Sequence, residues 1–188
     1  MALRLTVLFL VVSLLFAVPA FAQARPILER VSLVTVAAAG EWPHVRVSDP
    51  SAAMALRHGL DTASRLLDDA ECQTLLTEFQ TGEGQPLTAA LLQMSLGIQD
   101  YLRFVYFFDG SQHPACSTAV AYTAVSGRVV FVCAKSLERH WRSNRNHVVF
   151  ALVHEVLHTL GLGENPPSSP EITYRVRNRC WSALAAAR

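Results

Sequence analysis

The chain has 188 residues, of which 51% are hydrophobic and 16% are charged, and its formal net charge at pH 7 is +1. This near-neutral balance argues against a nucleic-acid-binding protein and against a polybasic membrane-surface protein, because both need concentrated positive charge. A chain of this length can bury one substantial core, which predicts a single domain.

Residues 1–22 have the pattern of a secretory signal peptide. The basic residue Arg4 precedes an apolar run over residues 5–18, and Pro19 and small residues up to Ala22 follow it. The run is too short to span a hydrocarbon core of about 30 Å comfortably, so a retained membrane anchor is the less favoured alternative. We predict cleavage after Ala22, a mature chain with a net charge near zero, and a protein that is secreted or periplasmic and no longer attached to the membrane.

All four cysteines follow this segment. An even number of cysteines in an exported chain predicts two disulfides, and the lack of any CxxC pair argues against a cysteine zinc site. Three pairings are possible. We favour Cys116–Cys133, which would join neighbouring strands, together with Cys72–Cys180, which would tie an early helix to the last one.

The first half of the expected domain is mainly helical. Residues 23–48 are predicted to be an N-terminal arm, whose short β-branched runs could hold a strand. A helical pattern opens after Asp49-Pro50 and extends, with leucines at helical spacing, to about Phe79. A glycine-rich loop follows, and a second helix is predicted over residues 87–96.

Three runs typical of strands come next. Residues 101–108 are rich in aromatic and branched side chains and end at Asp109-Gly110, which predicts a strand and a turn. Further strands are predicted over residues 118–123 and 128–133. A helix and a short C-terminal helix, starting near residue 168 or 169, complete the chain. We therefore predict an α+β fold for residues 49–188, a single zincin-like domain in which a small sheet packs on an active-site helix.

The helix that follows the last strand carries the sequence HEVLH, residues 154–158. Polar residues at 142–146 can cap its start, and Gly161 stands where a left-handed residue often ends a helix. His154 and His158 are one turn apart and differ by only about 40° around the helix axis, so both imidazoles can face one metal ion. This spacing is a zinc signature, because neutral imidazole is a good zinc ligand.

Glu155 lies beside the first histidine but is rotated away from the expected metal position. There its carboxylate can reach a water bound at the open coordination position of the metal. Zinc lowers the pKa of such a water to near neutrality, and the carboxylate can take its proton and deliver it to a leaving group. We predict Glu155 as the catalytic base, and Tyr122 and Tyr174 are both candidates for stabilising an oxyanion.

Catalytic zinc sites generally use three protein ligands, and Glu164 is the predicted third ligand. Gly161 lets the chain reverse at the helix end and Gly163 relieves crowding, so the carboxylate can swing back towards the ion. Glu171 is the alternative, although a glutamate near a helix start can also stabilise the helix dipole. His147 lies two turns before the first histidine, about 10 Å away along the axis, and is too far to share the ion.

The segment from His154 to Glu164 reads HExxHxxGxxE and resembles the HExxHxxGxxH pattern of the metzincins, which are secreted zinc peptidases. Glu164 stands at the position of their third histidine, and carboxylate is also an acceptable zinc donor. The resemblance implies a zincin-like fold and a peptidase site. The chain departs from the pattern in one respect: no methionine follows Met94, so the methionine turn beneath the metzincin zinc is missing.

Residues 70–181 also resemble a group of exported bacterial zincin-like proteins, mostly without assigned function. In zincin folds, a strand beside the active helix often binds substrate as an added strand, and GRVVFVC (127–133) is the candidate here, with a buried sheet strand as an equally favoured interpretation. The most distinctive similar segment is GLGENPPSS (161–169). Its prolines bias Asn165 towards extended geometry, and they either fix Glu164 in place or form an ordinary rigid turn.

These features predict a secreted zinc-dependent metallopeptidase, or a zincin-like hydrolase, that acts on peptide or protein substrates. His154, His158 and Glu164 would hold Zn²⁺, and Glu155 would act on the metal-activated water. The alternative is a non-catalytic, metal-stabilised extracellular binding module, which would close its metal site with a fourth protein ligand.

Overall fold

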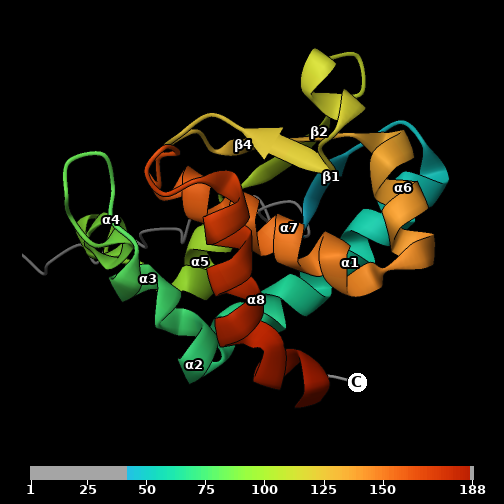
Figure 1. The fold of residues 1–188 in the computed structure, drawn as a ribbon. Helices are drawn as coiled ribbons and strands as arrows, with labels where there is room; N and C mark the ends of the chain where they lie inside the picture. The colour runs from blue at the N-terminus through green and yellow to red at the C-terminus, as the bar shows by residue number, and fades with distance from the viewer. Residues whose placement is uncertain (1–41, 187–188) are drawn as a thin grey trace, which may run out of the picture. The chain divides into compact units, whose positions relative to one another are not determined.

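The computed structural model describes residues 42–186, which fold as an α+β unit (Figure 1). The strands are β1 (His44–Arg46), β2 (Tyr106–Asp109), β3 (Ala121–Thr123) and β4 (Val129–Val132). The helices are α1 (Pro50–Asp68), α2 (Ala70–Gln73), α3 (Leu75–Glu78), α4 (Leu87–Gln93), α5 (Ile98–Leu102), α6 (Ala134–Ser143), α7 (Arg145–Thr159) and α8 (Ser169–Ala186), with a 3₁₀ turn η1 at Pro114–Ser117. The predicted signal peptide, residues 1–22, and the arm as far as residue 41 lie outside the described residues.

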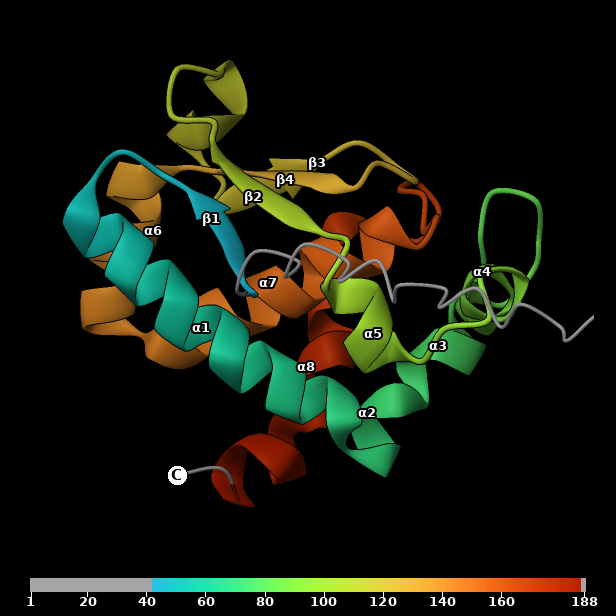
Figure 2. The same cartoon turned by 180° about the vertical axis from the view of Figure 1, so that it is seen from behind.

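The four described strands form one sheet in the order β1-β2-β4-β3. Strands β1, β2 and β4 run parallel, and β3 pairs antiparallel with β4, so that β3 lies at one edge. One face of the sheet packs on α7, and Figure 2 shows this helix between the sheet and α1. Val130 and Val132 of β4 are fully buried, whereas Phe131 between them is exposed, as the alternation of side chains along a strand requires.

Helix α7 lies at the centre of the fold because its side chains are apolar on almost every face. It contacts α1, α6 and α8 as well as the sheet, and its side chains from Val148 to Thr159 are buried apart from Ala151. The Asn144 side chain accepts the backbone N–H of His147 at 3.1 Å and so caps the helix start. At the other end, Gly161 adopts φ +104°, a left-handed conformation that ends the helix at little steric cost.

Helix α1 supports α7 from the side opposite to the sheet. Asp49 caps its start by accepting the N–H of Ala52 at 2.8 Å, and Pro50 occupies the first turn. At Gly59 the two helices come so close that an added Cβ would lie 2.9 Å from Leu152 Cδ1. The missing side chain therefore allows the close approach that fixes α7 against α1.

Both predicted disulfides are present. Cys116–Cys133 joins the η1 turn to the end of β4, and Cys72–Cys180 joins α2 to α8. Within the described residues no cysteine is free. None of the described helices is long and apolar enough to cross a membrane.

Several predicted elements have different bounds in the structure. The helix predicted over 87–96 ends at Gln93, and the strand predicted over 118–123 starts at Ala121. The strand predicted over 101–108 is wrong in its first half, because α5 extends to Leu102 and β2 starts only at Tyr106. Tyr101 is buried, and its hydroxyl donates a 2.9 Å hydrogen bond to the Thr159 carbonyl at the end of α7. This tertiary contact outweighs the strand preference of the aromatic residues.

The helix predicted up to Phe79 is interrupted at Asp69, where the chain leaves helical geometry. The Asp69 side chain accepts the N–H groups of Glu71 and Cys72, so it ends α1 and starts α2. Helix α6 was not predicted, and the C-terminal helix is longer than expected, extending over Ser169–Ala186. The candidate substrate-binding strand is also corrected: β4, which lies within residues 127–133, is paired on both sides, so the interpretation as a strand inside the sheet is the right one. Among the described strands β1 and β3 lie at the edges, and β3 is the one that borders the cleft.

Candidate metal centre

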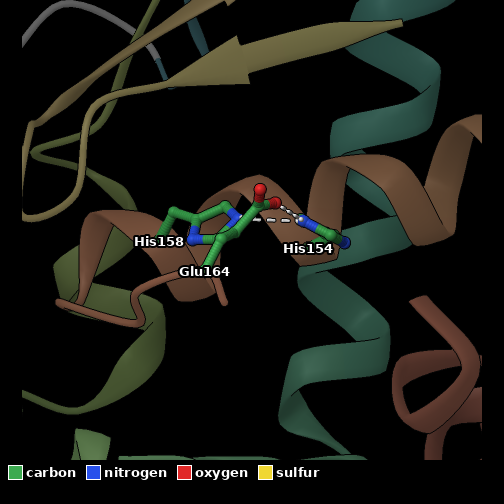
Figure 3. Close-up of side chains that lie close together, drawn as sticks. All are labelled: His154, His158 and Glu164. Atoms are coloured by element: carbon green, nitrogen blue, oxygen red, sulfur yellow. Dashed lines mark hydrogen bonds and ion pairs between the residues drawn. The ribbon is translucent and has the colours of Figure 1, made fainter. Parts of the chain in front are cut away.

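The two histidines of α7 face the same point, as their spacing predicts. His154 and His158 are both buried, and their Nε2 atoms lie 2.9 Å apart (Figure 3). Glu164 approaches from the segment after α7, with its Oε1 atom 3.3 Å from Nε2 of His158 and 3.5 Å from Nε2 of His154. These three residues form a group that could hold a metal ion.

Each imidazole is held in orientation by its other ring nitrogen. Nδ1 of His158 lies 2.6 Å from the Leu162 carbonyl oxygen, which can only accept, so this nitrogen carries a proton and Nε2 keeps its lone pair. Nδ1 of His154 lies 3.0 Å from the hydroxyl of Thr173 on α8, which can donate or accept. Second partners of this kind fix the tautomer and the ring direction of metal-binding histidines.

The segment that carries Glu164 turns back at the end of α7. Gly161 begins the reversal, and the backbone of Leu162 pairs with that of Thr81 in an isolated antiparallel bridge. Asn165 has φ +63° and donates its backbone N–H to the Pro167 carbonyl at 2.8 Å. The expectation of an extended Asn165 is therefore wrong; asparagine is among the residues that tolerate the left-handed region, and the turn uses this property.

The donor set fits a divalent cation. Three donors that each lie about 2.0–2.1 Å from a tetrahedral zinc are separated from one another by about 3.3 Å, which is close to the distances between these three side chains. Burial, followed by the neighbouring His158, lowers the pKa of His154 below its usual range, although Glu164 acts in the opposite direction. His154 is therefore neutral near pH 7, as a metal ligand must be.

Glu155 faces the same cleft from the next position of α7. Its side chain is buried, and burial, together with the nearby carboxylate of Glu164, raises its pKa to about 8. The backbone N–H of Thr123 in β3 acts in the opposite direction. The structure thus places an acid–base group with a pKa near neutrality beside the three potential ligands, which is an arrangement found at functional sites.

The cleft in front of these residues has a volume of about 420 Å³. Helix α7 forms its floor, and residues 118–125, which include the edge strand β3, form one wall. Ser169 and Thr173 line it from α8. Glu164, whose side chain is 40% exposed, lies at its rim, so the potential ligand group is open to solvent on one side.

The remaining predicted residues lie apart from the group. Glu171 makes a 2.5 Å ion pair with Arg175 one turn along α8 and is not in the cleft wall. His147 lines the far end of the cleft and contacts the ring of His140 on α6, at 4.8 Å between ring centroids. Of the two tyrosines, Tyr122 lines the cleft, whereas Tyr174 is exposed and does not.

Sequence reasoning did not identify the partners of the histidines. Thr173 is 19 positions away from His154 in the chain, and nothing in the local sequence marks it. The Leu162 contact is made by a backbone carbonyl, which leaves no signature in residue type. The reversal at Gly161 was the one signal that could have indicated a carbonyl near His158.

A larger hollow of about 940 Å³ lies between α1, α6 and the start of α7. Its walls carry the ion pairs Arg65–Asp61 and Arg142–Glu138, each formed within one helix and accessible to solvent. Within residues 42–186 the only group with metal-ligand geometry is the one in the smaller cleft. We therefore place the candidate site in the smaller cleft.

Comparisons with protein-family models, with curated proteins and with solved structures found no match to this chain.

Proposed function

We propose that this chain is a secreted zinc-dependent metallopeptidase, or a zincin-like hydrolase, whose centre is His154, His158 and Glu164. The observation that supports it is the meeting of three potential ligands and a buried glutamate, Glu155, in one cleft open to solvent. Two imidazoles and one carboxylate are a typical ligand set of catalytic zinc in hydrolases. A zinc ion supplies Lewis acidity, which polarises a substrate carbonyl and lowers the pKa of a coordinated water.

The chain's own residues would provide proton transfer and orientation. Glu155 would accept a proton at its carboxylate and return it to the leaving amine. Burial raises its pKa to about 8 in the metal-free protein, and a divalent cation at the ligand group would favour the ionised form that accepts the proton. Thr173 and the Leu162 carbonyl hold the two imidazoles in a fixed direction, so little reorganisation is needed. Tyr122 is the tyrosine in position to contact substrate, since it lines the cleft.

The free edge of β3 supports a peptide as the substrate. This strand pairs with β4 on one side and borders the cleft on the other, so an extended peptide could add to the sheet there. The backbone of Thr123 lies close enough to Glu155 to influence its pKa. A peptide bound along β3 would therefore pass directly over the catalytic base and the ligand group.

A non-catalytic binding module is less well supported. Structural zinc sites are closed by four protein ligands, whereas the group contains three and borders a cleft. A structural site also has no use for a buried glutamate next to the ligands.

The test is a peptide-library digest read by mass spectrometry, with zinc-loaded protein, chelator-treated protein and the variant Glu155→Gln. We expect hydrolysis that is lost with chelator, returns with zinc, and falls at least about 100-fold in Glu155→Gln, because a positioned acid–base group contributes about 10²–10⁴-fold. Metal content should be unchanged in that variant. Undiminished hydrolysis by Glu155→Gln would remove this residue from its role, and a fully zinc-loaded wild type that cleaves no peptide would contradict the proposal.

A further inference from the structure

The cleft continues beyond the ligand group towards the start of α7. A second hollow, of about 190 Å³, shares His147 and Thr173 with the cleft as common wall residues. Its other walls come from Asn144 before α7, from Asn146 and Phe150 on α7, and from the middle of α8. The second hollow therefore adjoins the cleft, and the side chains of His147 and Thr173 lie where the two meet.

The second hollow carries a positive charge that is not neutralised by the fold. It is lined by Arg177 and Trp181 of α8 and by Asn144 and Asn146. Arg177 is exposed, and its guanidinium lies 5.7 Å from the centre of the Trp181 ring. Among residues 42–186, no carboxylate lies within ion-pair distance of Arg177.

The neighbouring arginines of α8 are different in this respect. Arg175 pairs with Glu171, and Arg179 pairs with both Glu71 and Glu78. Each of these two side chains thus has an acidic partner in the fold. Arg177 is the arginine of α8 that lines the hollow, and it has no acidic partner among the described residues.

The distance from the ligand group in the cleft to the second hollow corresponds to a short peptide segment. His147 precedes His154 by seven residues on α7, which is about 10 Å at 1.5 Å per residue. An extended peptide covers this distance with about three residues at about 3.3 Å each. A group bound in the second hollow, beside His147, would therefore lie about three residues from the cleaved bond.

The direction of such a peptide follows from the course of the edge strand. The N–H of Ser126 donates to the His158 carbonyl at 2.9 Å, and Thr123 lies near Glu155, so the chain from β3 onwards runs in the same sense as α7. A peptide that added antiparallel to β3 would run in the opposite sense, towards the start of α7. Its carboxyl-terminal part would then approach Arg177.

We propose that Arg177 and the asparagines beside it bind a carboxylate on the carboxyl-terminal side of the cleaved bond, about three residues away. The inference rests on the proposed peptidase function. A guanidinium binds carboxylate through paired, charge-assisted hydrogen bonds, and asparagine amides can add further donors. The carboxylate can be the terminal one of the substrate, in which case a short peptide is released, or that of an acidic side chain.

Three matched peptide pools, randomised over Ala, Val, Leu, Phe and Ser, separate these sources. One pool has free carboxyl termini, one has amidated termini, and one has amidated termini with a single Glu placed at each position in turn. If the bound carboxylate is the terminal one, zinc-loaded wild type should cleave the first pool about three residues from the end. If it is that of an acidic side chain, the third pool should be cleaved about three residues before Glu. In either case the favoured pool should be cleaved about tenfold faster than the amidated pool. Arg177→Gln should abolish this preference, so that it cleaves the pools that carry a carboxylate no faster than the amidated pool.

Arg175→Gln is the matched control, because it removes the same charge from the same helix but lies outside the cleft and the second hollow. The preference of this variant for pools that carry a carboxylate should equal that of wild type. If wild type and Arg177→Gln cleave all pools alike, the carboxylate site is wrong although the peptidase function stands. Binding gives a second readout that does not need turnover: labelled peptides of the three pools are titrated against zinc-loaded Glu155→Gln protein with and without Arg177→Gln. A carboxylate preference that disappears with Arg177→Gln supports the inference even if nothing is cleaved, and equal binding of all pools, or no binding, overturns it.

Discussion

The histidines of the centre depend on two unlike partners. The Leu162 carbonyl can only accept, so the neutral His158 ring has one possible tautomer, with its lone pair on Nε2. Thr173 can act as donor or acceptor, so His154 can change tautomer when a cation binds. Without a cation, the 2.9 Å contact between the two Nε2 atoms requires a proton, which His154 can supply while its Nδ1 accepts from Thr173.

The role of Thr173 can be tested by substitution. Thr173→Val keeps the shape of the side chain but removes the hydroxyl, and zinc affinity should fall about 10–100-fold, the usual cost of losing such a partner. Zinc affinity is measured by competition with a chromogenic chelator. Thr173→Ser, which keeps the hydroxyl, should restore most of the affinity. Equal affinities of wild type and Thr173→Val would show that His154 needs no partner on α8.

The raised pKa of Glu155 makes the stability of the metal-free protein depend on pH. The folded protein holds this proton up to about pH 8, whereas the unfolded chain releases it near pH 4.5, so stability is lost as pH rises between these values. His154, whose pKa is lowered, has the opposite effect: it reduces stability as pH falls, and it does so only below its ordinary pKa of 6.5.

From pH 6.5 to 8, therefore, only Glu155 of these two groups makes the free energy of unfolding depend on pH. In the presence of chelator, the free energy of unfolding should fall over this range by about 2 kcal/mol more in wild type than in Glu155→Gln. The measurement is urea unfolding at several pH values. Parallel pH profiles of the two proteins would show that Glu155 titrates normally in the fold.

Much of the centre could be predicted from residue types and spacing. His154 and His158 converge because one helical turn separates them, and the glycine at 161 indicated that the chain could return with Glu164. Spacing alone left Glu171 open as a ligand, and the structure separates the two glutamates, since Glu171 pairs with Arg175. Thr173 could not be predicted, because its place depends on how α8 packs on α7.

The reversal after α7 determines where Glu164 lies, and Gly161 allows the reversal. Its φ of +104° is strained for any side chain, and an added Cβ would lie 3.1 Å from Thr81 Cγ2. Gly161→Ala should lower the free energy of unfolding by about 1–2 kcal/mol and weaken zinc binding, because the segment that carries Glu164 has to shift.

Gly163 offers a matched control for this prediction. It has no positive φ, and an added Cβ there would have no neighbour within 4 Å, so the expectation that Gly163 relieves crowding before Glu164 is wrong. Gly163→Ala should change stability by less than about 0.5 kcal/mol. Calorimetric unfolding and zinc titration of both variants check this. Equal effects of the two substitutions would mean that the backbone at Gly161 does not position the ligand.

The helices and strands that could be predicted are those whose apolar residues follow a continuous local pattern. Helix α7 was predicted because its apolar surface is long and its end is marked by glycine. The aromatic residues of 101–108 predict a strand, but the packing of Tyr101 against the end of α7 keeps the first part of this segment helical. Residues 127–133 fitted a substrate-binding edge strand and a buried sheet strand equally well, since the sequence of a strand does not reveal that β3 will pair beside it.

The whole fold is tied together by two crosslinks of different reach. Cys72–Cys180 spans 108 positions and links α2 to α8, the helix that carries Thr173, whereas Cys116–Cys133 spans 17. Because a longer loop loses more freedom in the unfolded chain, removing Cys72–Cys180 should cost about 4–5 kcal/mol and removing Cys116–Cys133 about 3 kcal/mol. Denaturant unfolding of the two double Cys→Ala variants measures both costs, and the reverse order would contradict the chain-entropy explanation.

The account as a whole depends on one divalent cation being held by side chains from α7 and from the segment that follows it. The most direct measurement is the zinc content per chain after saturation and dialysis, determined by elemental analysis for wild type, His154→Ala and His158→Ala. We predict one zinc per chain in wild type and a loss of that zinc in both variants, with circular dichroism used to show that the fold is retained. A wild type without stoichiometric metal, or folded variants that retain as much zinc as wild type, would contradict the metal centre.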